Sequence, residues 1–497
     1  MKKQKIAIIG AGLGGLTAGN LLAARGHDVT VFEAHSAPGG YTAGFRRKGF
    51  YFESGTLSFE MSRDVFAAME RLGVLHQLRF VRQHGRFLGE RFDYTSESYP
   101  GFREAMFAAY PEKRDALAGY FRELDGMYTA MRSLMVGPGR PFPLSTLSTA
   151  AAAARMARLW LKYKDVSIDD FTARHFERDS ELHRLFSGFG YPGMAAFLVG
   201  GALATIFDDY WTVQDGMQRW ADVLAEALAG HGGKLVLKTK VERIRTRDGR
   251  AVGVTTAGGG DHDADWVIAA GDYKKALLEL LDDPSLIPTA LAEKTRAATV
   301  SDGIFTVYLG LSVSNDRLRE LLKLPHVFAL FDQPGAERRD PADEGYYEKC
   351  GYTLYSPSLH DPSLAPEGKS GLMLQAVAPL RWMDDWGGGD RARYRELKDR
   401  VKDTLIRRAG AVIPGLAGLV EFSDAATPRT YERYTANTDG ATSAWSWRPE
   451  SRFHPGLMGT YIDTPVKHLL IGSCWATQIG GIPGALNAAL ACAKKIG

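Results

Sequence analysis

Three glycines near the N-terminus stand at the spacing that binds a dinucleotide. Gly10, Gly12 and Gly15 form a GxGxxG pattern. In such a pattern the first glycine permits a tight turn, the second lets the backbone approach a pyrophosphate, and the third lets a helix pack closely on a strand. Glu33 follows about twenty residues later, where a carboxylate accepts hydrogen bonds from ribose hydroxyls. These residue types predict a nucleotide cofactor held by backbone N–H groups and one acid.

The neighbouring segments have the composition of the elements that must position these residues. Lys5–Ile9 is an apolar run typical of a strand buried on both faces, and an apolar helix follows from Leu13. Asp28–Phe32 is a second β-rich run that ends directly before Glu33. The order strand, glycine turn, helix, strand and acid distinguishes a dinucleotide-binding unit from a loop without a ligand. Leu13 and Gly14 lie inside this turn, so we expect their backbone to contact the cofactor as well.

A second group of glycines narrows the choice of nucleotide. Gly39 and Gly40 follow Glu33 closely, and Gly55-Thr56 comes after the next apolar run. A glycine pair at this place resembles the flavoproteins of the amine oxidase and phytoene desaturase group, where it meets the FAD diphosphate. The resemblance implies FAD rather than NAD. Those proteins usually carry arginine after the pair, whereas Tyr41 stands here, so backbone contacts are expected at this position without a charge contact.

The composition limits the class of protein. A chain of 497 residues exceeds a single ordinary core, which predicts two closely joined domains. The net charge of +3 argues against general nucleic-acid binding. Three cysteines without paired spacing predict neither a disulfide framework nor a metal knuckle, and the twelve histidines have no paired ligand spacing, so we expect no metal site. His35, His454 and His468 are interpreted as surface or packing residues.

Two stretches bear on location. No signal peptide precedes the first strand, and the longest uncharged run, 187–207, contains Pro192 and several glycines. We therefore expect a cytoplasmic protein in which this run lines a core or a tunnel. Residues 150–163 form an alanine-rich helix with Arg155, Arg158 and Lys162 along one side. Two interpretations of that helix remain open. It contacts a membrane surface peripherally, or it packs on the rest of the protein with its basic side in solvent.

The middle and end of the chain predict a discontinuous α/β architecture. A helix from Gly216, strands at 234–237, 241–246 and 251–256, and a buried strand at 264–271 return the chain to the nucleotide domain. A second sheet is predicted from strands at 304–311, 326–331, 352–355, 372–377 and 420–423, with a charged helix at 390–409 and a surface loop at 334–349. We predict a Rossmann-type FAD-binding domain made of residues 1–95, 216–300 and 460–497. Residues 96–215 and 301–459 would form an interleaved substrate-binding domain of mixed sheet and helices, with the site at the domain interface.

Four motifs extend the resemblance over nearly the whole chain. They are the N-terminal unit, DGM at 215–217, the pair SPS (356–358) and DPSLAPEG (361–368), and GGIPGA at 480–485. Together they resemble the phytoene desaturase-like family, which includes carotenoid desaturases, carotenoid isomerases and retinol saturases. The resemblance implies that Val241 touches adenine, and that Gly472, Gly481 and Ile482 lie where the last helix points at the pyrimidine edge of the flavin.

The same resemblance implies an FAD-dependent oxidoreductase acting on carbon–carbon bonds of a long apolar polyene or isoprenoid, by desaturation, saturation or isomerisation. An amine-oxidase-like flavoenzyme and a non-catalytic binding protein on the same fold remain alternatives. No second GxGxxG unit marks an NAD(P)H site, so the electron partner is expected to be diffusible, a quinone, oxygen or another carrier. No catalytic acid or base is identified. Asp208 and Asp209 are interpreted as a solvated helix end, and Trp445 and Trp447 fit core and substrate channel equally well.

Overall fold

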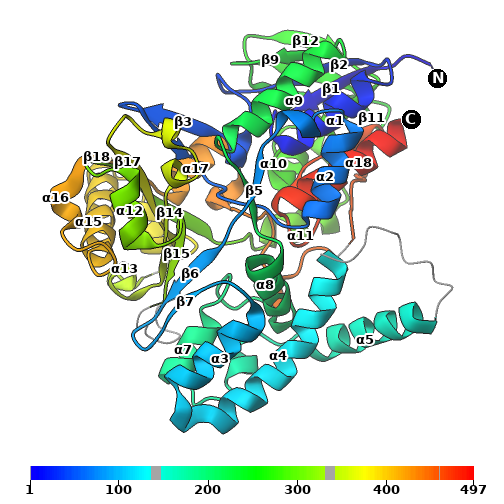
Figure 1. The fold of residues 1–497 in the computed structure, drawn as a ribbon. Helices are drawn as coiled ribbons and strands as arrows, with labels where there is room; N and C mark the ends of the chain where they lie inside the picture. The colour runs from blue at the N-terminus through cyan, green and yellow to red at the C-terminus, as the bar shows by residue number, and fades with distance from the viewer. Residues whose placement is uncertain (1, 136–146, 331–341, 458) are drawn as a thin grey trace.

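The computed structural model describes residues 2–135, 147–330, 342–457 and 459–497 (Figure 1). Its elements gather around two large sheets and a group of helices. Three stretches that are far apart in the sequence build the first sheet, in the order β19-β13-β1-β2-β9. Every neighbouring pair in it is parallel. Its strands are β1 (Lys5–Ile9), β2 (Asp28–Phe32), β9 (Lys234–Val236), β13 (Trp266–Ala269) and β19 (Leu469–Ile471).

Helices bury the faces of this parallel sheet. Its first helix, α1 (Leu13–Ala23), is buried along its whole length, which explains why its sequence is mainly apolar. It packs against α9 (Gln218–Gly230) and α18 (Gly481–Ile496), and Figure 1 shows these helices together beside both chain ends. The architecture is the predicted α/β Rossmann-type arrangement.

A smaller antiparallel sheet follows α9, and it differs from expectation in two ways. It consists of β10 (Val241–Arg247), β11 (Arg250–Thr256) and β12 (Gly260–Asp263). Residues Lys234–Val236, predicted as a strand in sequence with 241–246 and 251–256, lie apart from those two strands and extend the parallel sheet next to β2. The glycine-rich turn leads directly into β12, a polar exposed strand whose composition gave no apolar alternation to detect. Two helices follow β13, namely α10 (Tyr273–Leu278) and α11 (Thr289–Ala297).

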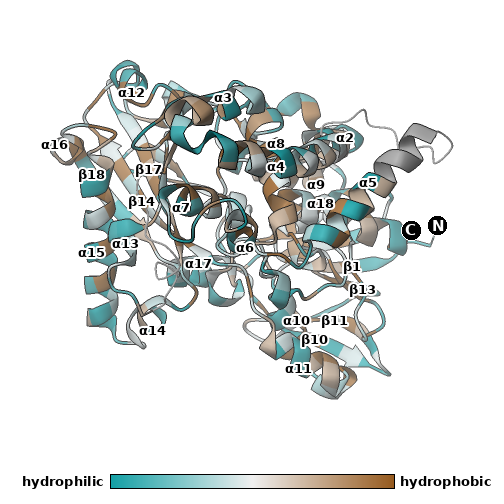
Figure 2. Ribbon diagram, turned by 90° about the horizontal axis from the view of Figure 1, so that it is seen from below, coloured by the Kyte–Doolittle hydropathy of each residue, from teal (hydrophilic) through white to brown (hydrophobic). Residues whose placement is uncertain are grey.

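The second large sheet is mixed and has the order β18-β14-β17-β16-β15-β6-β7. Its predicted strands are present as β14 (Gly303–Leu311), β15 (His326–Ala329), β16 (Tyr352–Tyr355), β17 (Ser370–Ala378) and β18 (Val420–Ala426). Helix α15 (Arg391–Ala409) buries Leu397, Val401 and Leu405 against it, and its other residues are largely hydrophilic (Figure 2). Shorter helices complete this part: α12 (Asn315–Leu322), α13 (Tyr346–Lys349), α14 (Trp382–Gly387), α16 (Leu416–Leu419) and α17 (Pro428–Thr435).

A helical group with its own hydrophobic core forms the remaining part of the molecule. It contains α3 (Tyr99–Ala109), α4 (Arg114–Met135), α5 (Leu147–Tyr163), α6 (Ile168–Thr172), α7 (Glu181–Ser187) and α8 (Ala196–Asp208). The uncharged run 187–207 supplies α8, which packs along α4 and is buried, so the core interpretation of that run is confirmed. Among the described residues, none of the helices is long and apolar enough to cross a bilayer.

Short elements tie these parts together. The hairpin of β3 (Gly44–Arg47) and β4 (Phe50–Glu53) touches the second sheet through β17, and α2 (Ser62–Arg71) contacts α18. Strand β5 (Phe80–Arg82) pairs with β8 (Trp211–Val213).

Two sequence expectations meet the structure only in part here. The predicted FAD-binding residues 1–95 include β6 (Gly85–Leu88) and β7 (Asp93–Thr95), yet β6 pairs with β15 in the second large sheet. The division into domains remains a prediction. The observed difference is that β6, from the predicted FAD-binding segment, lies in the sheet of the other predicted domain. Of the predicted loop 334–349, residues 334–341 lie outside the described part, and Tyr346–Lys349 form α13.

Candidate functional site

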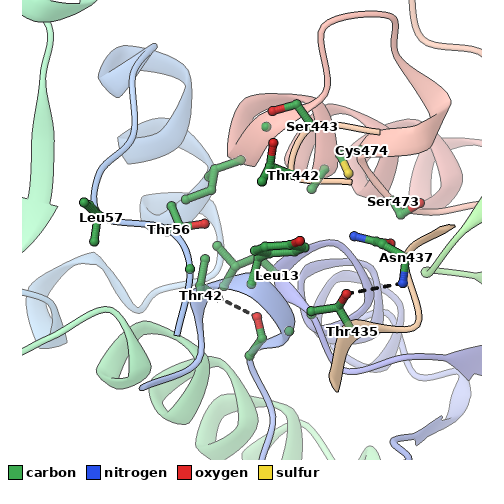
Figure 3. A pocket seen from close by; sticks show the side chains of 18 of the residues that line it. Leu13, Thr42, Thr56, Leu57, Thr435, Asn437, Thr442, Ser443, Ser473 and Cys474 are labelled. Atoms are coloured by element: carbon green, nitrogen blue, oxygen red, sulfur yellow. Dashed lines mark hydrogen bonds between the residues drawn. The ribbon is translucent and has the colours of Figure 1, made fainter. Parts of the chain in front are cut away.

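A cavity of about 490 Å³ lies where the parallel sheet meets the second large sheet. Segments from the beginning, middle and end of the chain line it, and Figure 3 shows their side chains converging on one space. The lining includes most of the residues predicted from the sequence: Gly10, Gly12, Leu13, Gly14, Glu33, Gly39, Gly40, Tyr41, Gly55, Thr56, Gly481 and Ile482.

The N-terminus of α1 opens into this cavity without a side-chain cap. Gly12 occupies the N-cap position, which no side chain fills, so the first N–H groups of the helix are free for an anion. A side-chain carbon built on Gly12 would meet no protein atom within 4 Å. Gly10 has a φ of +101°, a conformation that favours glycine. The turn therefore presents backbone and open space, which is what a diphosphate needs.

The two glycine groups lie directly against each other. The Gly39 N–H donates to the Ala11 carbonyl at 2.9 Å, and Gly12 and Gly39 form a parallel bridge. A Cβ on Gly40 would lie 3.6 Å from the Cα of Gly12. The two glycine groups therefore line the same part of the cavity wall.

Glu33 stands at the end of β2 with its carboxylate anchored to backbone. One oxygen accepts a hydrogen bond from the Ala11 N–H at 2.8 Å and the other accepts from the His35 N–H at 2.9 Å. These bonds fix the carboxylate beside the glycine turn, and each oxygen keeps a lone pair for further donors.

Three predicted residues lie outside the cavity lining. A Cβ on Gly15 would lie 2.1 Å from the Gly10 carbonyl oxygen, and one on Gly14 would lie 2.3 Å from the Gly472 oxygen. Gly15 and Gly472 therefore act in close packing of helix on strand. Val241 is the buried first residue of β10. Contact of these three with the cofactor, as of the lining residues, stays a prediction.

Tyr41 occupies the place where arginine was expected from the resemblance. Its hydroxyl donates to the Gly440 carbonyl at 2.7 Å, and its ring stacks on Tyr431 at 5.4 Å. Burial raises the pKa of Tyr41 well above the usual value, so the side chain is neutral. It forms part of the cavity wall and supplies no charge.

Polar side chains that the sequence gave no reason to group also reach the cavity. Glu60, Tyr191, Tyr210 and His326 all line it, although they come from four distant segments. The Tyr210 hydroxyl and His326 Nδ1 form a hydrogen bond of 3.0 Å, and burial lowers the pKa of His326 to about 3. Histidine is therefore neutral here. The alternation of apolar Leu57 and Phe59 with polar Ser58 and Glu60 is a sequence signal that pointed to a strand-like segment here.

The structure also shows where the remaining aromatic and acidic candidates lie. Trp445 is a core residue, stacked on Phe453 at 3.8 Å, whereas Trp447 lines the cavity. Asp209 is only 1% exposed, so its interpretation as a solvated helix end is wrong. The reason is local: its carboxylate accepts hydrogen bonds from the Ser62 N–H at 3.1 Å and from the Trp211 indole at 3.0 Å. Asp208 bonds the Tyr128 hydroxyl.

The three histidines assigned to packing do pack. His35 stacks on Tyr434, His454 on Tyr461 and His468 on Trp266.

Comparison with known proteins decides the family. Residues 13–497 match the family described as flavin-containing amine oxidoreductases. The chain belongs to this family. It is an FAD-dependent oxidoreductase, and the uncapped helix end, the open space at Gly12 and the anchored Glu33 fit FAD.

Similar proteins include enzymes named for carotenoid chemistry. A 4,4'-diapophytoene desaturase of Methylomonas sp is 25% identical, covering 90% of this chain and 88% of that protein. Prolycopene isomerase 1 of an Oncidium hybrid cultivar is 25% identical, covering 98% of this chain and 83% of its own length. The resemblance to the phytoene desaturase-like group is thereby confirmed.

Among solved structures, a triple mutant of putrescine oxidase superposes with a TM-score of 0.67 at 17% identity, covering 99% of this chain and 98% of the other. That similarity supports the fold alone.

Proposed function

We propose that this enzyme changes carbon–carbon bonds of a long apolar polyene or isoprenoid substrate, by desaturation, saturation or isomerisation. The observation that carries the proposal is the similarity to a diapophytoene desaturase and a prolycopene isomerase over nearly the whole chain. The cavity is compatible with such a substrate, because apolar side chains line it beyond the glycine turn: Leu57, Ile304, Phe328, Trp447 and Ile479.

FAD would be held mainly by the N-terminal unit. The free N–H groups at the start of α1 and the loop of Gly39 and Gly40 suit the diphosphate, and the Glu33 carboxylate suits the ribose hydroxyls. When bound, FAD supplies two-electron hydride chemistry. Gly481 and Ile482 bring the N-terminus of α18 to the same cavity, where its partial positive charge favours an anionic partner.

Two alternatives are less well supported. The similarity to a putrescine oxidase structure does not support an amine oxidase activity, because at 17% identity it is evidence for the fold alone. A non-catalytic binding protein would have no need of a glycine turn, a ribose acid and a shared cavity that remain intact together.

Anaerobic incubation of the purified protein with candidate polyenes tests the proposal, once with oxidised flavin and once after the flavin has been reduced. Mass analysis of the products separates the three reactions, since a desaturase removes two hydrogens, a saturase adds two, and an isomerase changes retention without changing mass. If no polyene is converted while an amine is oxidised, the amine oxidase alternative replaces the proposal.

The electron partner and the location complete the proposal. Electrons are exchanged with a diffusible acceptor or donor, a quinone, oxygen or another carrier, because the sequence has no second dinucleotide motif. Contact with a membrane surface would let a lipid-soluble substrate reach the cavity. Helix α5 is the candidate for this contact: it extends away from the main body in Figure 1 and carries Leu161, which is 69% exposed, between the cations Arg158 and Lys162.

A further inference from the structure

Glu60 is a carboxylic acid held at the cavity by its neighbours in the chain. Phe59 forms an antiparallel bridge with Trp211, through N–H···O bonds of 2.8 and 3.0 Å. The next residue, Glu60, lines the cavity. A Cβ on Gly481 would lie 3.5 Å from Glu60 Oε1, so the carboxyl group sits beside the N-terminus of α18. The acid is therefore placed next to the helix end that borders the cofactor cavity.

The neighbouring acid, Asp209, has a different environment. Its oxygens accept hydrogen bonds from the Ser62 N–H, the Ser62 hydroxyl and the Trp211 indole N–H, which fix it as an acceptor at the start of α2. Among the described residues, the hydrogen-bond donor that bears on the Glu60 carboxylate is its own backbone N–H. Two neighbouring carboxyl groups thus have separate roles: Asp209 is structural, and Glu60 lines the cavity.

The groups around Glu60 bring the proton equilibrium of its carboxyl group close to neutral pH. Burial raises the pKa of Glu60 to about 7, and the charge of Asp209 adds to this. The partial positive charge at the start of α18 opposes both effects. Tyr191 and Tyr210 also face Glu60, but burial raises the pKa of each hydroxyl above its usual value, so both stay protonated. Glu60 is the group in this set that can both release and accept a proton at physiological pH.

The proposed chemistry leaves one proton to be handled. Removing hydrogen from two adjacent carbons takes away one hydride and one proton, and saturating a double bond consumes the same pair. The flavin accounts for the hydride. In desaturation its electrons pass to a diffusible quinone or oxygen, and in saturation they come from a diffusible reductant such as a reduced quinone. We propose that Glu60 is the catalytic acid–base residue, whose carboxylate accepts the proton in desaturation, or whose carboxyl donates it in saturation, and then exchanges it with solvent. This inference rests on the proposed function.

Three variants of the FAD-loaded protein test the role of Glu60. Glu60→Gln keeps the shape of the side chain but cannot exchange a proton, Glu60→Asp keeps a carboxyl group further back, and Glu70→Gln is the control at an exposed position of α2. We expect Glu60→Gln to lower kcat for the polyene at least about 100-fold while flavin occupancy and thermal midpoint stay near those of Glu70→Gln.

A spectroscopic readout separates catalysis from structure. The flavin absorbance of the wild type, titrated without substrate, should show a transition with a midpoint near pH 7. We expect this transition to be absent in Glu60→Gln and displaced in Glu60→Asp. A Glu60→Gln enzyme with kcat within threefold of the wild type would overturn the inference.

If Glu60→Gln does not hold flavin, the Glu60→Asp variant tests the inference instead. A displaced midpoint of the flavin absorbance titration together with a reduced kcat supports acid–base catalysis by Glu60. An unchanged midpoint refutes it. A wild type that shows the transition but converts no polyene would instead refute the proposed function, and the proton site at Glu60 would still stand.

Discussion

The Glu33 carboxylate accepts a hydrogen bond of 2.8 Å from the Ala11 N–H, so the acid that ends β2 is fastened to the glycine turn that follows β1. One side chain thereby shapes the turn and offers its remaining lone pairs to the cavity. This double role leads to the first prediction, on cofactor affinity.

Glu33→Ala should purify largely colourless. Each charge-assisted hydrogen bond that is lost to a ribose hydroxyl is worth about 1.5–3 kcal/mol, or roughly 10- to 150-fold in the dissociation constant of FAD. Titration of the unfolded-and-refolded or flavin-stripped protein with FAD, followed by fluorescence, measures the change. Glu97→Gln, at an exposed position, is the control. Wild-type affinity in Glu33→Ala would remove this acid from the cofactor site.

Gly12→Ala should separate folding from cofactor binding. The added methyl group meets no protein atom within 4 Å, so the fold should persist, but the group would project from the N-cap where a diphosphate approaches. We expect a thermal midpoint of the flavin-free protein within a few degrees of the wild type and a loss of FAD binding of at least about tenfold. Gly230→Ala, where a Cβ also meets nothing, is the matched control.

Gly15→Ala should behave differently from Gly12→Ala. Its methyl group would lie 2.1 Å from the Gly10 carbonyl oxygen, so the helix has to move away from the strand. We expect a clear fall in stability together with the loss of flavin, measured by thermal unfolding monitored by circular dichroism. If Gly15→Ala were as stable as Gly12→Ala, the close packing of α1 on β1 would not be the reason for this glycine.

A buried acid should make the stability of the protein depend on pH. Glu53 is 1% exposed, and it accepts hydrogen bonds from the Tyr51 hydroxyl at 2.7 Å and from the Met217 N–H at 3.0 Å. Burial raises the pKa of Glu53 from 4.5 to about 8, despite these two donors. The folded state therefore binds more protons than the unfolded state between these pH values, and stability must fall as the pH rises through this window.

We expect the thermal midpoint of the wild type to drop between pH 5 and pH 8, and the slope to be shallower in Glu53→Gln. Glu60, with a pKa of about 7, contributes in the same direction, so the difference between the two slopes isolates Glu53. Tyr51→Phe removes a donor that favours the charged form, and it should raise the pKa of Glu53 further. An identical slope in wild type and Glu53→Gln would mean that Glu53 is ionised in the folded protein at pH 7.

The membrane proposal predicts binding to anionic vesicles through the outer side of α5. Met156, Leu159 and Trp160 pack toward the helical core, and the exposed residues of the described part of α5 include Arg155, Arg158 and Leu161. Flotation with anionic vesicles at low salt should recover part of the wild type, and added salt should reduce this fraction.

The variant Arg155→Glu/Arg158→Glu/Leu161→Ser should stay in the soluble fraction. Lys162 is left unchanged because it forms an ion pair with Glu123 at 3.1 Å. Arg391→Glu/Arg395→Glu on α15 changes the same number of exposed arginines elsewhere and should float like the wild type. If the wild type itself does not float at low salt, the membrane contact is excluded.

Local patterns in the sequence were sufficient for the cofactor unit. Gly10, Gly12 and Glu33 act within about twenty residues of one another, and a turn, a helix start and a strand end are determined by neighbouring residues. Five of the seven strands of the second sheet, β14 to β18, were also predicted, because runs with apolar residues mark them whatever their partners are. Strands β6 and β7 were not predicted, and β7 has no apolar run. The exposed strand β12 was missed for the same reason, since nothing apolar marks it.

Only the tertiary structure decided which side chains share the cavity. Glu60, Tyr191, Tyr210 and His326 are brought together by pairing between distant segments, such as the bridge of Phe59 with Trp211. It also decided that Asp209 is buried and hydrogen-bonded while Glu60 lines the cavity. Desolvation and the charge of a neighbour set the pKa of an acid, and both depend on which atoms surround it in space. Some of the residues that surround each of these acids are distant from it in the sequence, so the sequence alone does not identify them.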